Sequence, residues 1–341
     1  MIQKTRRKEG EKLNMGKISA QITENNLTQP TIKSKTKIKS DVPLIQSLIR
    51  DKWLYILLLP GLVYFVVFKY LPMWGIVIAF QDYSPFTGVL GSKWVGFDNF
   101  IDFFKNPDFF RLLKNTAIFA VLNLVFFFPA PIILSILLNE LRVDSYKRVV
   151  QTFIYVPHFM SWVIIASITY IFFTTSGGIV NDIVSQIYGK KIDFLSSPDW
   201  FRPLIMLQII WKETGWGTVI FLAALTSVDK EQYEAAIVDG AGRFRRLWHV
   251  TLPAIRSTII VMLILQLGRF LDTGFQQIYL MSNSLNRGVA DVFDTYVYFV
   301  GITQGAYSYS TAVGLFKSII GVILVLGSNK LAKKMGEEGI F

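Results

Sequence analysis

The chain has 341 residues, of which 52% are hydrophobic, 15% aromatic and only 17% charged, and its formal net charge is +11. Soluble domains carry roughly 25% charged residues, so this composition argues against a cytosolic enzyme and a disordered basic protein and predicts a membrane protein. The absence of cysteine excludes disulfides, iron–sulfur clusters, thiolate zinc sites and cysteine nucleophiles. The two histidines, His158 and His249, lie far apart in the sequence and give no basis for a histidine-rich metal site.

Residues 1–52 form a polar, basic N-terminal segment. They contain twelve Lys or Arg and five Asp or Glu, so +7 of the chain's +11 lies within them. No basic surface with interleaved aromatic residues accompanies this charge, and the positive-inside rule explains it more simply than nucleic-acid binding. No apolar run follows closely enough for a secretory signal peptide. We expect a disordered cytoplasmic tail over 1–52, a membrane domain over 53–335 and a cytoplasmic end over 336–341.

Six segments approach the roughly 20 apolar residues that a transmembrane helix needs. The expected spans are 53–80, 115–138, 149–173, 203–225, 254–280 and 311–327. In the first, Lys69, Pro72 and Gly75 interrupt the second half, so a span over 53–68 alone is the alternative. The tail and every second loop hold 22 Lys or Arg, whereas the other loops hold 8. This asymmetry predicts an all-α, multi-pass protein of the plasma membrane with both termini in the cytoplasm.

The predicted cytoplasmic loop between the fourth and fifth spans carries signals for a short helix. Asp229 is a good N-cap, and Gln232 three residues later predicts a capping box. A helix then fits residues 233–238, and Gly240 and Gly242 are expected to end it, because glycine accepts left-handed or closely packed backbone. One face of the helix carries small alanine side chains, and its apolar residues have no obvious core in which to pack. It suits docking on another protein, and packing on the chain's own membrane helices is the alternative.

The spacing in this loop resembles the pattern EAA-x3-G-x9-I-x-LP of binding-protein-dependent ABC importer permeases. The residues that carry it are Glu234-Ala235-Ala236, Gly240, Val250 and Leu252-Pro253. Valine stands for the usual isoleucine and keeps its branched shape. Weaker stretches look like the permeases of oligosaccharides and polysaccharides in the same group, and they lie at 94–100, 155–162, 211–217, 274–277, 291–297 and 309–318.

The resemblance implies the type I importer permease fold, with a cytoplasmic coupling helix between spans four and five. It implies a non-enzymatic pore subunit that pairs with a second homologous permease, with two ATP-binding cassette subunits and with an extracellular, lipid-anchored binding protein that delivers an oligosaccharide. ATP and magnesium would be bound by the cassette subunits, since this chain has no GxxxxGK[ST] loop and no expected cofactor. The residues implied in coupling are Tyr233, Glu234, Ala235, Ala236, Asp239, Gly240, Ala241, Leu252 and Pro253.

Polar side chains within membrane spans are costly, so they are functional candidates. Together with tryptophans that can stack on sugars, they give the substrate-pathway candidates Asn123, His158, Trp162, Trp211, Trp216, Gln266, Arg269, Asp272 and Gln276. We expect Gln266, Arg269 and Gln276 to share a face of the fifth span, and Arg269 and Asp272 to be close enough to pair. An Arg269 that is not fully paired can take a carboxylate in bidentate fashion, which gives the hypothesis of a uronate-containing oligosaccharide.

An ion-coupled secondary carrier is the alternative function. It accounts for six spans and for membrane carboxylates such as Glu213 and Asp272, but not for the EAA spacing. Transport by this chain alone, driven by an ion gradient and independent of ATP, would favour the carrier. A membrane enzyme finds no support, because the sequence offers no nucleophile and base pair, metal cluster or lipid-phosphate motif.

Overall fold

The computed structural model describes residues 50–141, 143–334 and 336, so the tail expected over 1–52 lies almost wholly outside the described residues. The chain divides into two units, residues 1–66 and 67–341, and each is described by itself. The described residues of both units are mainly helical. The described strands are β1 (Gln81–Asp82) and β2 (Lys93–Trp94), which pair antiparallel. The expected all-α fold class is therefore confirmed.

In the first unit, the described helix is α3 (Lys52–Phe65), and all its residues are exposed. The helical run continues along the chain through η1 (Val66–Tyr70), α4 (Leu71–Met73) and η2 (Trp74–Phe80), which change the helix type from α to π and 3-10. The whole run has the length and hydropathy of a membrane span. The residues expected to interrupt it therefore alter its helix type without ending it.

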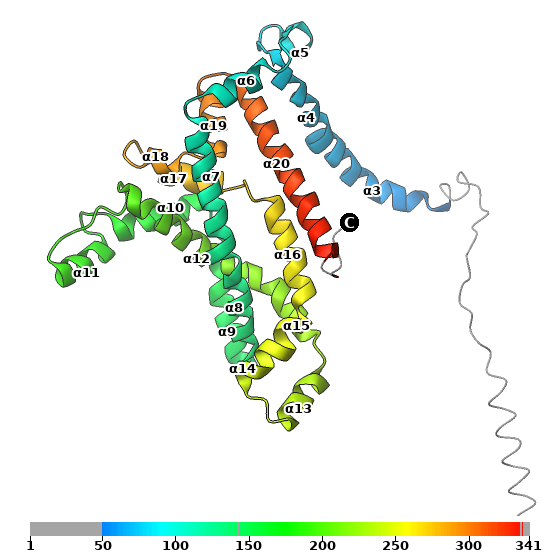
Figure 1. Cartoon of the computed structure of the whole chain (residues 1–341), viewed down its shortest axis with the longest axis vertical. Coiled ribbons are helices and arrows are strands. Elements are labelled where there is room, and N and C mark those ends of the chain that lie inside the picture. Colours follow the sequence, from blue (N-terminus) through cyan, green and yellow to red (C-terminus); the bar gives the residue numbers. More distant parts are fainter. Residues whose placement is uncertain (1–49, 142, 335, 337–341) are drawn as a thin grey trace, which may run out of the picture. The chain divides into compact units, whose positions relative to one another are not determined.

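After the end of the first helical run, the second unit continues with two short helices, α5 and α6, and then with longer ones. Its first half contains α5 (Gly88–Gly91), α6 (Asp98–Lys105), α7 (Phe109–Leu122), η3 (Asn123–Phe127), α8 (Pro129–Asn139), α9 (Asp144–Tyr155), η4 (Val156–Phe159), α10 (Trp162–Phe173) and α11 (Ile179–Tyr188). Its second half contains α12 (Pro198–Thr226), α13 (Lys230–Val238), α14 (Arg243–Arg246), η5 (Leu247–Thr251), α15 (Leu252–Ala254), α16 (Arg256–Gly268), α17 (Phe275–Met281), α18 (Arg287–Ala290), α19 (Phe293–Tyr298), η6 (Phe299–Thr303) and α20 (Tyr307–Lys334). Figure 1 shows α13 to α15 at one end of this unit and α5 and α6 at the other.

Three described helical runs are long and apolar enough to cross a membrane, at Lys52–Phe80, Phe109–Asn139 and Tyr307–Lys334. Two bent pairs raise the number to as many as five. The fourth expected span falls in α12, which has 29 residues but carries Lys212 and Glu213 in its middle and is not among the five. The exact count of six spans stays a prediction.

Two of the expected spans are wrong as continuous helices. The third, 149–173, bends by 101° between η4 and α10, where the Ser161 hydroxyl accepts a hydrogen bond from the Ile164 N–H and caps α10. The fifth, 254–280, stops being helical after Gly268 and resumes at Phe275, next to Gly274 with a left-handed φ of 84°. Hydropathy reports apolar composition, and it does not register where the backbone turns.

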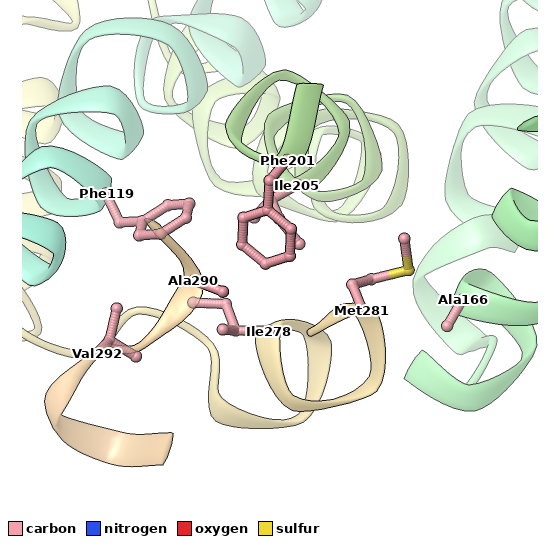
Figure 2. Packing of buried hydrophobic residues seen from close by; sticks show 8 residues of the cluster. All are labelled: Phe119, Ala166, Phe201, Ile205, Ile278, Met281, Ala290 and Val292. Atoms are coloured by element: carbon pink, nitrogen blue, oxygen red, sulfur yellow. The ribbon is translucent and has the colours of Figure 1, made fainter. Parts of the chain in front are cut away.

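A hydrophobic cluster joins α7, α10, α12, α17 and α18. Its buried members are Phe119, Ala166, Phe201, Ile205, Ile278, Met281, Ala290 and Val292. In Figure 2 the Phe119 ring points toward that of Phe201, and the two meet edge to face with their centroids 6.2 Å apart. The Met281 side chain extends toward Ala166 in the same view. This cluster holds α17, the helix beyond the break in the fifth expected span, against the rest of the unit.

A buried chain of hydrogen bonds crosses the same helices. The Gln277 Nε2 donates to the Ile205 carbonyl at 2.7 Å and to the Gln208 Oε1 at 3.0 Å. The Gln208 Nε2 in turn donates to the Thr169 hydroxyl at 2.7 Å. Buried amides need such partners because an unmade hydrogen bond costs about 1–3 kcal/mol. These hydrogen bonds therefore fix the positions of α17, α12 and α10 relative to one another.

Gly215 provides a test of the contact between α9 and α12. A Cβ at this position would lie 2.1 Å from the Ile154 carbonyl oxygen. Over-packing of this kind costs roughly 1–3 kcal/mol, which outweighs the gain of about 1 kcal/mol from replacing glycine in a helix. We expect Gly215→Ala to lower the apparent melting temperature of the purified protein. Gly327→Ala, in α20 with no atom within 4 Å of the added Cβ, is the control, and equal melting temperatures would contradict the close contact.

Candidate functional site

The helix expected over 233–238 is α13, which begins three residues earlier at Lys230. The Asp229 carboxylate caps it by accepting the Glu231 N–H at 3.0 Å. The reciprocal bond expected from Gln232 does not form among the described residues. The N-cap was thus predicted correctly and the full capping box was not.

The C-terminal end of α13 is a tight turn at glycine. Gly240 has a φ of 73°, and the Ala241 N–H donates to the Ala236 carbonyl at 2.8 Å, which is the bond of a Schellman motif. The expectation for Gly240 is confirmed. Gly242 does not end the helix, because its backbone is extended and it forms the N-cap of α14.

The surface of α13 is largely open. Glu234 is exposed and has no ion pair with a described residue, while Ile237 and Val238 are 54% and 86% exposed. The helix is tied to the chain where the Tyr233 hydroxyl donates to the Thr251 hydroxyl of η5 at 3.1 Å. Packing on the chain's own helices therefore occurs at Tyr233 and leaves the acidic and apolar side chains available to a partner.

The remaining residues implied in coupling lie in this helix or after it in the chain. Ala235 and Asp239 are exposed, Ala236 and Ala241 are half-buried, and Leu252 and Pro253 lie in α15. An open cavity of about 490 Å³ lies at the base of α13, and Asp229, Gln232, His249 and Pro253 contribute to its lining. The residues of the EAA pattern thus lie together at the end of the unit that carries α13 to α15 (Figure 1).

Three of the substrate-pathway candidates meet beside the bend between η4 and α10. The His158 ring stacks on that of Trp216 with centroids 4.7 Å apart, and its Nδ1 lies 2.7 Å from the Glu213 Oε2. The Lys212 Nζ donates to the His158 carbonyl at 2.7 Å, pairs with Glu213 at 3.0 Å and lies 5.2 Å from the Trp162 ring centroid. The buried lysine is thereby compensated, while Trp216 remains 50% exposed.

Two other candidates stand apart from this group. Trp211 is 46% exposed and has no ring contact among the described residues. Asn123 is buried at the start of η3, where its Oδ1 has no hydrogen-bond partner in the described structure. In the described structure, neither side chain has a hydrogen bond, ion pair or ring contact with another substrate-pathway candidate.

The expected pair of Arg269 and Asp272 is wrong. Helix α16 ends at Gly268, so the three-residue helical spacing on which the pair rested is lost. Asp272 instead accepts a hydrogen bond from the Lys317 Nζ at 2.7 Å, and Lys317 also pairs with Asp294 of α19. Arg269 is exposed and has no ion pair with a described residue. The expected common face is wrong too, because Gln266 lies in α16, Arg269 in the break and Gln276 in α17.

These charges line an open cavity between the break, α19 and α20. Its volume is about 570 Å³, and Arg269, Asp272, Asp294 and Lys317 contribute to its wall, beside apolar residues such as Leu271. Lys317 pairs with the carboxylates of both Asp272 and Asp294. Of the two cations in the described cavity wall, the Arg269 guanidinium is therefore the one that can bind an anion.

The sequence-based candidates omit Lys317 and Asp294. Lys317 lies inside the sixth expected span, so the rule that charges within spans are functional candidates was sufficient to find it. Asp294 lies outside the expected spans, and nothing in its local sequence predicts that it meets a lysine from α20.

A second charged group ties the loop before α19 to α7. The Asn115 amide donates to the Gly288 and Asp291 carbonyls at 2.9 and 3.0 Å, and Arg111 and Arg287 contact the Asp291 carboxylate at 3.4 and 3.1 Å. Burial raises the pKa of the Asp291 carboxyl above its usual value, and the two arginines oppose that rise. This group holds the loop in place.

Residues 128–336 match the family described as binding-protein-dependent transport system inner membrane component. The chain belongs to this family. It is therefore a membrane protein and a permease component of a binding-protein-dependent ABC transporter, and the expected importer fold and non-enzymatic role are confirmed. The family match disfavours the secondary carrier as the function.

Two relatives from Bacillus subtilis (strain 168) are similar over most of their length. The chain is 68% identical to Protein LplB over 292 residues, which cover 86% of this chain and 92% of LplB. It is 57% identical over 298 residues to the polygalacturonan/rhamnogalacturonan transport system permease protein YteP, covering 87% and 93%. A subunit of a bacterial alginate ABC transporter, solved in complex with an alginate pentasaccharide-bound periplasmic protein, is similar with a TM-score of 0.80, 37% identity and coverage of 87% and 99%.

The triad of Lys317, Asp272 and Asp294 predicts a stability effect. Removing one partner of a buried ion pair costs roughly 3–5 kcal/mol, and we expect less here because the Asp272 side chain is 62% exposed. Lys317→Met should lower the apparent melting temperature in detergent, and adding Asp294→Asn should restore part of the loss because it removes the uncompensated charge. Lys330→Met, at an exposed position of the same helix, is the control. No difference between the two lysine variants would show that the triad does not stabilise the fold.

Proposed function

We propose that the chain is one of two pore subunits of an ATP-driven importer that passes oligosaccharides from an extracellular binding protein to the cytoplasm by alternating access. A second homologous permease completes the pore, two ATP-binding cassette subunits hold ATP and magnesium, and the binding protein is lipid-anchored. Both termini are cytoplasmic in this proposal. The saccharide class is supported by the names of YteP and of the alginate transporter, to which this chain is similar.

The observation that carries the coupling proposal is the exposed face of α13. Its Glu234 carboxylate has no ion pair with a described residue, and Ile237 and Val238 lack a core. In the proposed complex α13 lies in a cleft of one cassette subunit, and Glu234 pairs with a basic residue there. ATP binds one arrangement of the cassette pair better than the other, and that difference biases the equilibrium between the inward-open and outward-open states.

Charge reversal at α13 tests the coupling. Glu234→Lys places a cation where the proposed partner is cationic, and Gly240→Glu puts a side chain on backbone with a φ of 73°, which L-residues avoid at a cost of roughly 1–2 kcal/mol. Both variants should reach the membrane at normal levels and lose ATP-dependent uptake in cells or proteoliposomes.

Glu140→Lys is the matched control, because it makes the same charge change at another exposed position, beyond the end of α8. Normal uptake by inserted Glu234→Lys and Gly240→Glu proteins would overturn the role of α13. Uptake that continues without the cassette subunits or ATP would overturn the importer class itself.

We further propose that the saccharide is acidic and that Arg269 receives its carboxylate. Asp272 is held by Lys317, and Arg269 has no ion pair with a described residue. Arg269 also lines the cavity between the break, α19 and α20. A guanidinium fits a carboxylate with two parallel hydrogen bonds. A relative named for polygalacturonan and a structural neighbour named for the acidic polysaccharide alginate support an acidic substrate.

The exposed Trp216 ring, backed by His158, is proposed as an apolar platform for the sugar ring on the same pathway. Trp162, Trp211, Asn123, Gln266 and Gln276 remain proposed pathway residues. His158 and Lys212 hold the platform in place through Glu213, so their part would be to position Trp216.

Arg269→Gln separates an acidic substrate from a neutral one. A hydrogen bond to a charged group contributes roughly 1.5–3 kcal/mol, so uptake of uronate oligomers at low concentration should fall about ten- to a hundred-fold, while uptake of neutral oligomers of equal length should change little. Arg269→Lys should retain part of the uronate uptake, since lysine keeps the positive charge but cannot form the two parallel hydrogen bonds of the guanidinium. Equal loss for both sugars would remove the acid-specific role and leave the importer assignment untouched.

A further inference from the structure

Helix α11 has two clearly different halves. At about 100° per residue, its polar residues Asn181, Asp182, Ser185 and Gln186 cover one side and its apolar residues cover the other. Ile179, Ile183 and Ile187 form a row along the apolar side and are 52%, 53% and 68% exposed. Figure 1 shows α11 standing to one side of α10 and α12. Within the described chain, this apolar row is left uncovered.

Asn181 fixes α11 to the end of α10. The residue is fully buried, and its amide donates to the Phe173 and Thr174 carbonyls at 2.8 and 3.1 Å. Its Oδ1 accepts the Ile192 N–H at 2.8 Å, which ties in the loop that follows α11. The first turn of α11 is therefore held at the point where α10 stops, within the connection between α10 and α12.

Aromatic residues mark the level of this attachment. Phe173 contacts Phe194, and Phe194 contacts Trp200 at the start of α12, with ring centroids 5.4 and 4.8 Å apart. Tryptophan gathers at the boundary between the hydrocarbon core and water, and Trp200 is 40% exposed there. Exposed apolar residues also stand in the last turn of α10, where Ile171 and Phe172 are 63% and 40% exposed. Both the end of α10 and the isoleucine row of α11 therefore leave apolar side chains uncovered.

The charges lie where water or lipid headgroups would meet them. Asp182 is on the polar half and its Oδ1 lies 3.8 Å from the Lys191 Nζ, and Lys190 beside it is exposed. An amphipathic helix in the plane of a bilayer buries its apolar side about 5–10 Å into the boundary between headgroups and acyl chains and keeps its charges above it. α11 combines that division with attachment at the end of a span.

We propose that α11 is an interfacial helix that lies on the bilayer surface at the α10 end, with Ile179, Ile183 and Ile187 in the lipid. The partner of this surface is phospholipid, and the helix holds the connection between α10 and α12 at a fixed depth. This role is separate from the coupling face of α13 and from the saccharide cavity, and it does not depend on the identity of the sugar.

Single cysteines test the proposal in the complete transporter in lipid nanodiscs. The chain has no native cysteine, so Ile183→Cys and Ser185→Cys place one reactive thiol each on opposite sides of α11, and the transporter with the unsubstituted chain gives the label background of the other subunits. Each thiol carries an environment-sensitive fluorophore. Quenching is measured with lipids that carry a nitroxide near the headgroup end of the acyl chain and, separately, with aqueous iodide.

We expect the label at residue 183 to be quenched several-fold more by the nitroxide lipid than the label at 185, and the order to reverse with iodide. Ile187→Cys, one turn further along the same row, repeats the measurement independently and should behave as residue 183. Equal iodide quenching at 183 and 185 would place the row in water and overturn the proposal. Protection of 183 from both quenchers, with cross-linking of that thiol to the second permease, would overturn it in favour of a protein contact.

Discussion

Backbone groups inside a membrane must be satisfied by the protein itself, since the hydrocarbon offers no hydrogen bonds. Two membrane segments of this chain stop being helical part-way, after Phe159 and after Gly268, and each break frees backbone carbonyls and N–H groups. At the first break the Lys212 Nζ donates to the carbonyl of His158. At the second, Lys317 holds Asp272, a residue of the non-helical stretch itself. The charged clusters are therefore placed where the helices fail.

This arrangement explains why these charges are few and so well paired. An unpaired charge in a membrane span costs several kcal/mol. The buried Lys212 has Glu213 as its acidic partner, and the half-buried Lys317 has Asp294. Arg269 has no such pair with a described residue and remains exposed to an open cavity. A cation that the fold leaves without a partner points to a function outside the fold, and this supports its proposed role toward the substrate.

The breaks also bear on how α13 would act on the pore. Tyr233 joins α13 to η5, and α14, η5 and α15 lead into α16 with a bend of 62°. Helix α16 then ends at the non-helical stretch that carries Arg269 and Asp272. In the proposed coupling, movement of α13 by a partner would reach that stretch through Tyr233, the run from α14 to α15, and α16 beyond the bend. A break between two rigid helices is a place where backbone angles can change without disturbing either of them.

The sequence predicted local features well and failed where distant segments meet. The cap at Asp229 and the left-handed turn at Gly240 depend on a few neighbouring residues, and both were found. The partner of Asp272 depends on α20, 45 positions further along the chain, and a helical spacing rule pointed to Arg269 instead. Hydropathy likewise marked apolar segments and missed the breaks within two of them, because it averages composition and does not record where the backbone stops being helical.

Exposed branched residues have different meanings at α13 and α11, and their surroundings decide between them. On α13, Ile237 and Val238 stand beside Glu234 and Asp239 at the tip of a loop, so the apolar surface is small and bordered by acid. That suits a specific protein groove with a basic residue. On α11 the apolar surface covers half the helix, and the one charged residue of the helix, Asp182, lies on the other half. Asn181 holds the helix at the end of α10. A broad surface without a specific shape suits a lipid phase, which can cover any apolar side chain that reaches it.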